Sequence, residues 1–161
     1  MKSVPDVKFG LVFQCETQSV PVMRRVLGDT LRGLGVDEES VSDILLAATE
    51  ACTNVLRHGG RQLAGYAVVT SLGAVGCQIE VADEGIGMTS LARRPPAVPE
   101  RPAAEIPLAQ LPESGRGMAV MRACMDDVTL DSEPGRGTVV TLRKRVRWSQ
   151  DAPLRQLRAA S

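Results

Sequence analysis

Residues 37–60 read DEESVSDILLAATEACTNVLRHGG and carry the clearest structural pattern in the chain. Asp37 is a good N-cap residue and the glycine pair at 59–60 is typical of a helix end, so we predict a helix from Asp37 to about His58. The apolar side chains recur every three or four residues, as a helix with one buried face requires. They are Val41, Ile44, Leu45, Ala48, Ala51, Cys52, Val55 and Leu56.

Shorter patterns on both sides of this helix predict the other elements. Ser19 is placed to cap a helix over 20–34 that Gly35 ends, and a third helix is expected to start at Gly115. Strands are expected at 7–15, 66–72, 77–83, 127–132 and 138–145, the last four forming two hairpins. This order predicts an α+β fold, a two-layer sandwich with helices on one face of a mixed, mostly antiparallel sheet.

The 161 residues suit one domain, which we place at 1–146, followed by a polar basic tail at 147–161. Between 88 and 114 lie six of the ten prolines, and apolar periodicity is absent. So long a stretch without secondary structure is typical of an active-site lid or of disorder. From Arg143 onward the chain carries six basic residues against one acidic residue. We expect a solvated tail there, with a docking site for an acidic partner surface as the alternative.

Composition excludes several classes of protein. Apolar residues make up 43% and charged residues 24%, which argues against wholesale disorder. Nineteen basic residues balance nineteen acidic ones and only four residues are aromatic, so we expect no direct nucleic-acid binding. The first residues lack the apolar region of a signal peptide, and no apolar stretch reaches the roughly 18 residues of a membrane span. We therefore expect a cytoplasmic protein.

The cysteines are expected to be small buried hydrophobic residues. Cys15, Cys52, Cys77 and Cys124 are widely spaced, each in an apolar run, and His58 is the only histidine. This spacing does not favour a zinc site. His58 itself, at the end of the predicted long helix, suits a packing or capping role better than a catalytic one.

Three polar motifs are candidates for chemistry. Glu50 and Asn54 lie one turn apart on the polar side of the long helix, where both side chains can converge on one ligand or ion. Each motif alone has a plain structural explanation, and for this pair it is the polar face of any amphipathic helix.

The second motif is Asp83, which follows a predicted strand and precedes Gly85 and Gly87. A carboxylate there can accept a hydrogen bond from the exocyclic amine of adenine, and glycines let a ligand approach the backbone. The plain explanation is a turn at the end of a strand.

The third motif, Ser-Gly-Arg-Gly-Met at 114–118, directly precedes a predicted helix. Amide groups at a helix N-terminus bind phosphate well, and Arg116 can add a charged donor. A further Gly-Arg-Gly-Thr sequence at 135–138 is most simply a hairpin turn. Neither the P-loop nor the Rossmann fingerprint occurs in the chain.

Taken together and in order, these motifs resemble the N, G1, G2 and G3 boxes of the ATPase superfamily shared by gyrase, heat-shock-90 chaperones, histidine kinases and MutL. The resemblance covers about residues 10–145 and implies the histidine kinase-like (Bergerat) fold, with 88–114 as the ATP lid. The N box matches at Glu50 and Asn54, the G1 box at Asp83, Gly85 and Gly87, and the G2 box at Gly115 and Gly117.

Within that superfamily, the small size and the sequence around the N box look most like the bacterial anti-sigma factor serine/threonine kinases. The resemblance implies Glu50 as general base, Asn54 as Mg²⁺ ligand and Asp83 as the residue that reads adenine. The other nucleotide contacts that it implies are Gly85, Gly87, Gly115, Arg116, Gly117, Met118 and Thr138.

The partners that the resemblance implies are a sigma factor, a small anti-anti-sigma (STAS) protein phosphorylated on serine, and a second copy of the chain. A histidine kinase needs a phosphoacceptor histidine on a dimerisation helix, and this does not fit because the only histidine here ends the N box. Two alternatives stay open: an ATP-binding module that sequesters a partner with little or no kinase activity, and a regulatory ATPase unrelated to sigma factors. The long, proline-rich lid leaves room for the first.

Overall fold

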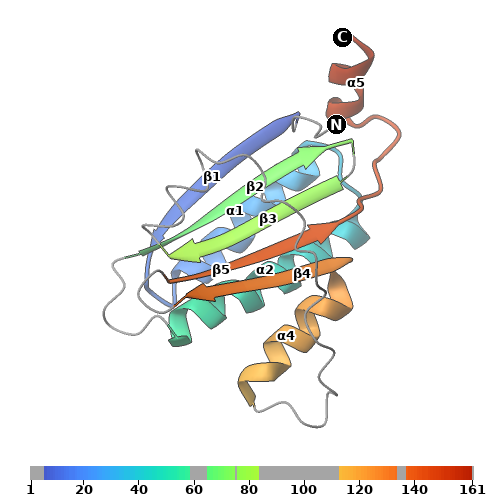
Figure 1. Cartoon of the computed structure of the whole chain (residues 1–161). Coiled ribbons are helices and arrows are strands. Elements are labelled where there is room, and N and C mark those ends of the chain that lie inside the picture. The colour runs from blue at the N-terminus through green and yellow to red at the C-terminus, as the bar shows by residue number, and fades with distance from the viewer. Residues whose placement is uncertain (1–5, 59–64, 75, 84–112, 134–136, 161) are drawn as a thin grey trace.

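Five strands form one antiparallel sheet in the order β1-β2-β3-β5-β4 (Figure 1). The structure is a computed structural model and describes residues 6–58, 65–74, 76–83, 113–133 and 137–160. The strands are β1 (Val7–Gln14), β2 (Gly65–Gly73), β3 (Gly76–Asp83), β4 (Asp127–Glu133) and β5 (Gly137–Lys144). All of the predicted strands are present, with ends that differ from the prediction by one residue or so.

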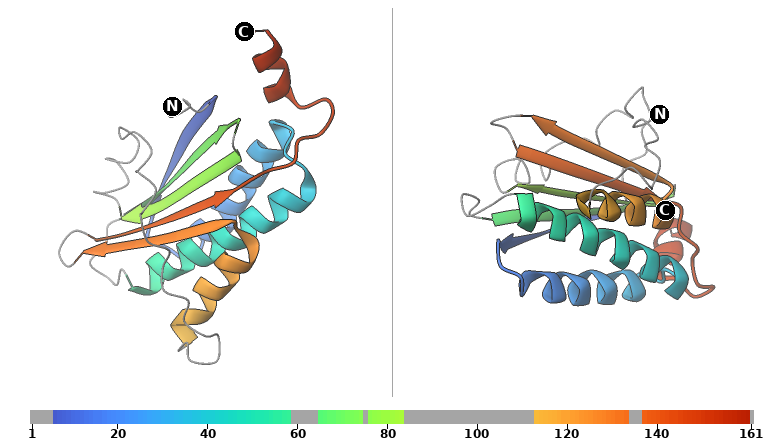
Figure 2. Two further views of the ribbon diagram at one scale, coloured as in Figure 1. Left: turned by 45° about the vertical axis from the view of Figure 1, so that its right-hand side comes forward. Right: turned by 90° about the horizontal axis from the view of Figure 1, so that it is seen from below.

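Three helices cover one face of this sheet, and α2 lies between α1 and α4 (Figure 2). Their bounds are α1 (Ser19–Gly33), α2 (Glu38–His58) and α4 (Glu113–Cys124), and a short helix α5 (Pro153–Ala159) follows the sheet. This arrangement confirms the predicted α+β class. Within the described strands every pairing is antiparallel, so the mixed sheet that we expected is antiparallel throughout.

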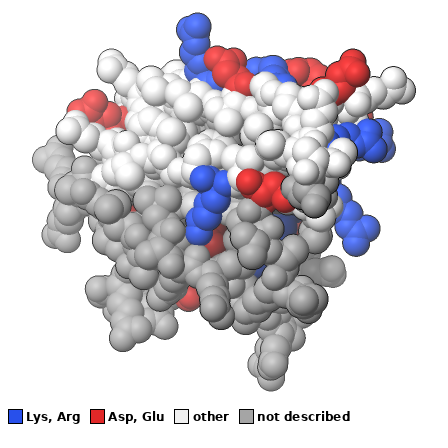
Figure 3. All heavy atoms as spheres, turned by 90° about the horizontal axis from the view of Figure 1, so that it is seen from above, with Lys and Arg blue, Asp and Glu red and all other residues white. Residues whose placement is uncertain are grey.

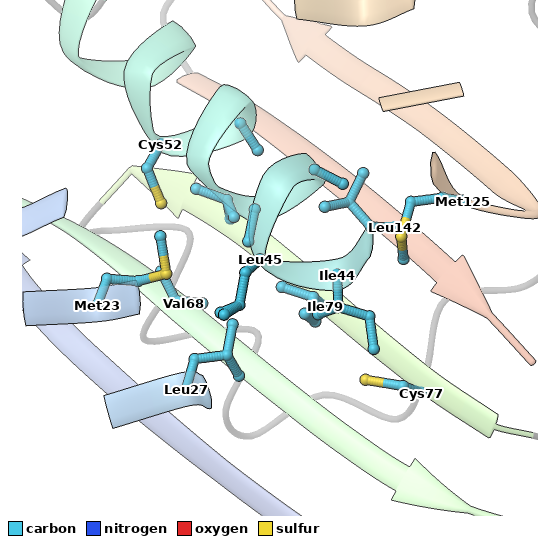
Figure 4. Close-up of a cluster of buried hydrophobic side chains, with 14 of the residues drawn as sticks. Met23, Leu27, Ile44, Leu45, Cys52, Val68, Cys77, Ile79, Met125 and Leu142 are labelled. Atoms are coloured by element: carbon cyan, nitrogen blue, oxygen red, sulfur yellow. The ribbon is translucent and has the colours of Figure 1, made fainter. Parts of the chain in front are cut away.

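The core lies between the sheet and the apolar face of α2 (Figure 4). Ile44 and Cys52 of α2 are fully buried, and they meet residues of α1 on one side and of the sheet on the other. The predicted apolar face is thereby confirmed. Burial raises the pKa of the Cys52 and Cys77 thiols to about 12, so both behave as the inert hydrophobic residues we expected.

Two of the predicted helix signals, at Asp37 and Gly35, are confirmed. The Ser40 amide donates to Asp37 Oδ1 at 3.3 Å, so Asp37 caps α2. Gly35 adopts φ +92° just after α1, a conformation that favours glycine. The predicted Ser19 cap is wrong: its hydroxyl bonds the Glu16 carbonyl at 2.5 Å and the Tyr66 hydroxyl at 2.6 Å. Ser19 is buried here, and its hydroxyl satisfies a buried tyrosine rather than a helix end.

The third helix begins at Glu113, before the expected start at Gly115. Both glycines of this motif therefore lie inside α4. Glycine lowers helix propensity by about 1 kcal/mol without preventing a helix, and an acidic residue in the first turn favours one.

The segment after β5 differs most from expectation. Residues 145–160, here called the C-terminal strap, return to the corner between α1 and α2, where Val36 and Trp148 form a β-bridge. Ala152 and Leu154 are buried, so the prediction of a solvated tail is wrong for this part of the strap. The segment is basic overall, but its apolar residues Trp148, Ala152 and Leu154 pack against the core.

Backbone hydrogen bonds hold the strap in place. The Asp37 amide donates to the Arg147 carbonyl at 2.9 Å, and the Ser149 amide donates to the Gly35 carbonyl at 2.8 Å. A Cβ at Gly35 would lie 2.5 Å from Ala152 Cα, so the strap packs where only glycine leaves room.

Among the described residues in Figure 3, acidic and basic side chains lie side by side along one rim of the face. Nothing in the described helices is long and apolar enough to cross a membrane.

Candidate nucleotide site

The candidate site lies at the end of the sheet where β3 ends and β5 begins. The C-terminal end of α2 lies at the same end of the molecule (Figure 1). Asp83 is the last residue of β3, and Thr138 is the second residue of β5, the strand paired with β3. The Thr138 amide donates to Asp83 Oδ2 at 3.1 Å, which fixes the carboxylate against the neighbouring strand. The structure therefore brings the predicted G1 aspartate and the predicted G3 threonine together.

The N-box residues come from α2. Glu50 and Asn54 are both half-buried and lie one turn apart on this helix, as the spacing predicted. Arg24 of α1 reaches the same turn from the side, where its guanidinium donates to Thr49 Oγ1 at 2.6 Å. This contact ties the Thr49 turn of α2 to α1.

The G2 motif approaches the N box directly. A Cβ at Gly117 of α4 would lie 3.0 Å from Glu50 Oε2, which is tighter than nearly all real contacts of this kind. Its backbone does not adopt the left-handed conformation, so the constraint at this position is space: a side chain here would push the Glu50 carboxylate aside. α4 therefore packs closely on α2 at the carboxylate that the resemblance assigns to catalysis.

A buried hydrogen bond stabilises the site from the core side. Tyr66 of β2 is fully buried, and its hydroxyl pairs with the Ser19 hydroxyl of α1. Burial raises the pKa of Tyr66, so the phenol stays neutral and acts as a hydrogen-bonding group. Cys52 of the N box lies next to it and interacts with the same hydroxyl. Sequence periodicity could show that these residues are buried, but not that they form a polar contact behind α2.

The remaining predicted residues are only partly described. Arg116 is exposed on α4, while Met118 packs its side chain against the core, so any nucleotide contact at Met118 would use its backbone. Gly115 lies in α4. Gly85, Gly87 and residues 88–112 of the predicted lid lie outside the described residues, as does the side chain of His58.

The chemistry of this group of residues suits a nucleotide with a magnesium ion. An amide oxygen such as that of Asn54 is a hard ligand that Mg²⁺ accepts in proteins, and Glu50 offers a carboxylate one turn away on the same helix. Asp83 supplies an acceptor at the other side, in a place fixed by the backbone of β5. The donor set therefore fits the ion and the base that the resemblance implies.

A two-layer α+β domain with these residues at one end of its sheet defines a nucleotide-binding ATPase-type domain. The chain belongs to the histidine kinase-like ATPase domain family, whose model matches residues 13–144. The match confirms the resemblance that the four motifs suggested. It ends at the last residue of β5, so the C-terminal strap lies beyond it.

Curated relatives cover most of the chain. It is 30% identical over 148 residues to an anti-sigma F factor of Clostridium acetobutylicum, covering 89% of this chain and 97% of that protein. It is 31% identical over 144 residues to an anti-sigma F factor of Bacillus velezensis (87% and 93%). It is 25% identical over 135 residues to serine-protein kinase RsbW of Bacillus cereus (83% of each chain).

A solved structure supports the fold. The crystal structure of the RsbU and RsbW domains of a Mycobacterium tuberculosis protein superimposes with a TM-score of 0.63 at 19% sequence identity. The match covers 88% of this chain and 33% of that one, so this chain corresponds to a third of the solved protein. It confirms the architecture of sheet and helices.

Proposed function

We propose that this protein is an ATP-dependent serine kinase that also acts as an anti-sigma factor. Its phosphoacceptor would be a serine of a small anti-anti-sigma (STAS) protein, and its second partner a sigma factor. The observation that supports the proposal is the close approach of Gly117 to Glu50: the motif predicted to bind phosphate lies beside the carboxylate predicted to act as base. The relatives named anti-sigma F factor and serine-protein kinase support the choice of partners.

Asp83 would select adenine. Its carboxylate offers about four lone-pair positions, so the Thr138 amide does not exhaust them. The exocyclic amine of adenine can donate to this carboxylate, whereas guanine presents a carbonyl acceptor at the same place. A carboxylate held at the end of a strand therefore favours ATP over GTP.

Glu50 would act as general base. The serine hydroxyl oxygen attacks the γ-phosphorus, its proton passes to the Glu50 carboxylate, and the bond to the β–γ bridging oxygen breaks to release ADP. Asn54 would hold Mg²⁺ through its amide oxygen. When bound, the ion neutralises phosphate charge. Gly115, Gly117 and the amides that follow them would position the phosphates.

A homodimer, a cytoplasmic location and the absence of direct nucleic-acid binding are further proposals. The balance of nineteen basic and nineteen acidic residues supports the last of these. The resemblance to anti-sigma kinases supports the other two.

The test is capture of partners from native cytoplasm, followed by transfer of labelled phosphate from ATP to the captured proteins. The Glu50→Ala variant should lose most of the phosphate transfer and still capture the same partners. Glu39→Ala is the matched control: it removes an exposed glutamate of the same helix that lies 3.8 Å from Arg147, far along α2 from Glu50. Capture without any phosphate transfer by the parent protein would favour the sequestering module without kinase activity.

A further inference from the structure

Lys144, the last residue of β5, joins the two helices that carry the candidate site. Its ammonium group donates to the Cys124 carbonyl at 2.8 Å and lies 3.2 Å from Asp43 Oδ2. Cys124 ends α4, and Asp43 lies in the N-terminal half of α2. The Lys144 side chain is 15% exposed and that of Asp43 38%, so the lysine end of this link is shielded from water.

The backbone of Lys144 is itself fixed. It pairs with Cys77 of β3, and Gly76 packs so closely on the Lys144 carbonyl that a side chain at position 76 would clash. The lysine therefore projects from a rigid strand. A cation that binds the last carbonyl of a helix is also favoured by the helix dipole.

The link lies at a defined distance from the catalytic contact. Asp43 and Glu50 are seven residues apart on α2, and Gly117 and Cys124 are seven residues apart on α4. At about 1.5 Å per residue, each pair spans roughly 10 Å along its helix. The helices therefore run antiparallel and pack against each other; Lys144 links them at one place, and Gly117 faces Glu50 at another.

We propose that Lys144 is a positioning residue for the phosphoryl-transfer reaction, which sets the placement of α4 relative to Glu50. Apolar packing alone lets two helices slide or rotate slightly, and the polar link through Lys144 fixes the position of one end of α4 on α2. Removal of the Lys144 contacts frees the end of α4, and Gly117 then shifts against the Glu50 carboxylate. This inference rests on the proposed kinase function for its activity readout.

The test compares three variants. Lys144→Met keeps an unbranched side chain only one atom shorter and removes its charge, whereas Lys144→Arg retains a cation. Arg143→Met is the matched control: Arg143 neighbours Lys144 on β5, but its guanidinium lies 3.0 Å from Asp127 Oδ2 and donates to Gln78 at 2.9 Å, on the other face of the sheet. Both β5 cations are thus tested, and only one contacts α2 and α4.

For Lys144→Met we expect kcat to fall on the order of tenfold while the KM for ATP changes by less than about threefold, because misplacement remote from the reacting atoms affects the rate more than binding. Lys144→Arg should recover most of the rate, and Arg143→Met should retain it. A folded Lys144→Met protein with the parental kcat overturns the proposal, as does an equal loss in Arg143→Met.

Hydrogen exchange provides a second, independent readout. In Lys144→Met without nucleotide, the amides of 118–124 should exchange faster, while those of β2 and β3 keep the parental rate. If the parent protein transfers no phosphate to any partner, the kinase function fails and this exchange measurement decides the positioning role alone. Unchanged exchange in α4 overturns it.

Discussion

A Cβ added at Gly117 would lie 3.0 Å from Glu50 Oε2, so α4 meets α2 at the carboxylate proposed as the base. The neighbouring atom is the end of a flexible side chain, and it can move at little energetic cost. A small change at Gly117 can thus displace the carboxylate without unfolding the protein.

We predict that Gly117→Ala lowers phosphoryl transfer by at least tenfold and changes the free energy of unfolding by less than about 1 kcal/mol. The gain in helix propensity from alanine, about 1 kcal/mol, offsets the crowding. Gly33→Ala in α1 is the control, because nothing lies within 4 Å of the added Cβ. Parental activity in Gly117→Ala would show that the contact does not matter for catalysis.

Glu50→Ala should separate binding from chemistry. We expect ATP affinity within a few-fold of the parent and a transfer rate lower by roughly 10²–10⁴, the range for loss of a general base. Calorimetry and single-turnover transfer measure the two quantities. A parental rate would make Glu50 a plain surface residue.

Asp83→Asn should weaken ATP binding by about 1–3 kcal/mol, because a charge-assisted acceptor becomes an amide that is partly mismatched to its donors. The Thr138 amide, now 3.1 Å from the carboxylate, must compete with adenine for one carbonyl oxygen. Calorimetry with ATP and GTP is the measurement. Equal affinity of the parent for both nucleotides contradicts the adenine assignment.

Gly35→Ala should lower the free energy of unfolding by at least about 2 kcal/mol, since the left-handed conformation alone costs an alanine 1–2 kcal/mol. The clash with Ala152 Cα adds to this, and urea denaturation measures the sum. A loss below about 1 kcal/mol would show that the strap leaves the corner easily.

The buried thiols predict a loss of stability in alkali. Burial raises the pKa of Cys77 from 9.0 to about 12, so the unfolded chain releases its proton at a lower pH than the folded one. The stabilisation is complete below pH 9 and is lost as pH rises toward 12, by about 1.4 kcal/mol per pH unit for each such group. Cys77→Ala should make the alkaline slope of unfolding free energy shallower by that amount. An unchanged slope would show that this thiol ionises equally in both states.

Local patterns in the sequence predicted α2 and its apolar face, because periodicity and capping are properties of neighbouring residues. They also predicted the motifs of the site. The hydrogen bond from Thr138 to Asp83 joins residues 55 positions apart, and no local pattern specifies it. The same holds for Lys144, which reads in sequence as one more charge at the end of a strand.

The Ser19 cap and the solvated tail failed for a related reason. A serine before a helix usually caps it, and a basic, polar stretch at the end of a chain usually lies in solvent. Tertiary packing overrides both here, through the buried Tyr66 hydroxyl and through Ala152 and Leu154.

The strap also bears on the order of synthesis. At the corner where α2 begins, Val36 pairs with Trp148, which lies 112 residues later in the sequence and is therefore translated much later. The helix that carries Glu50 is complete in sequence early, and Glu38 in its first turn can already pair with Arg32. The contacts of this turn are complete only when Arg147 and the residues up to Leu154 have emerged. We therefore expect the nascent chain to gain nucleotide-binding competence late in translation, when the sheet and this corner close together.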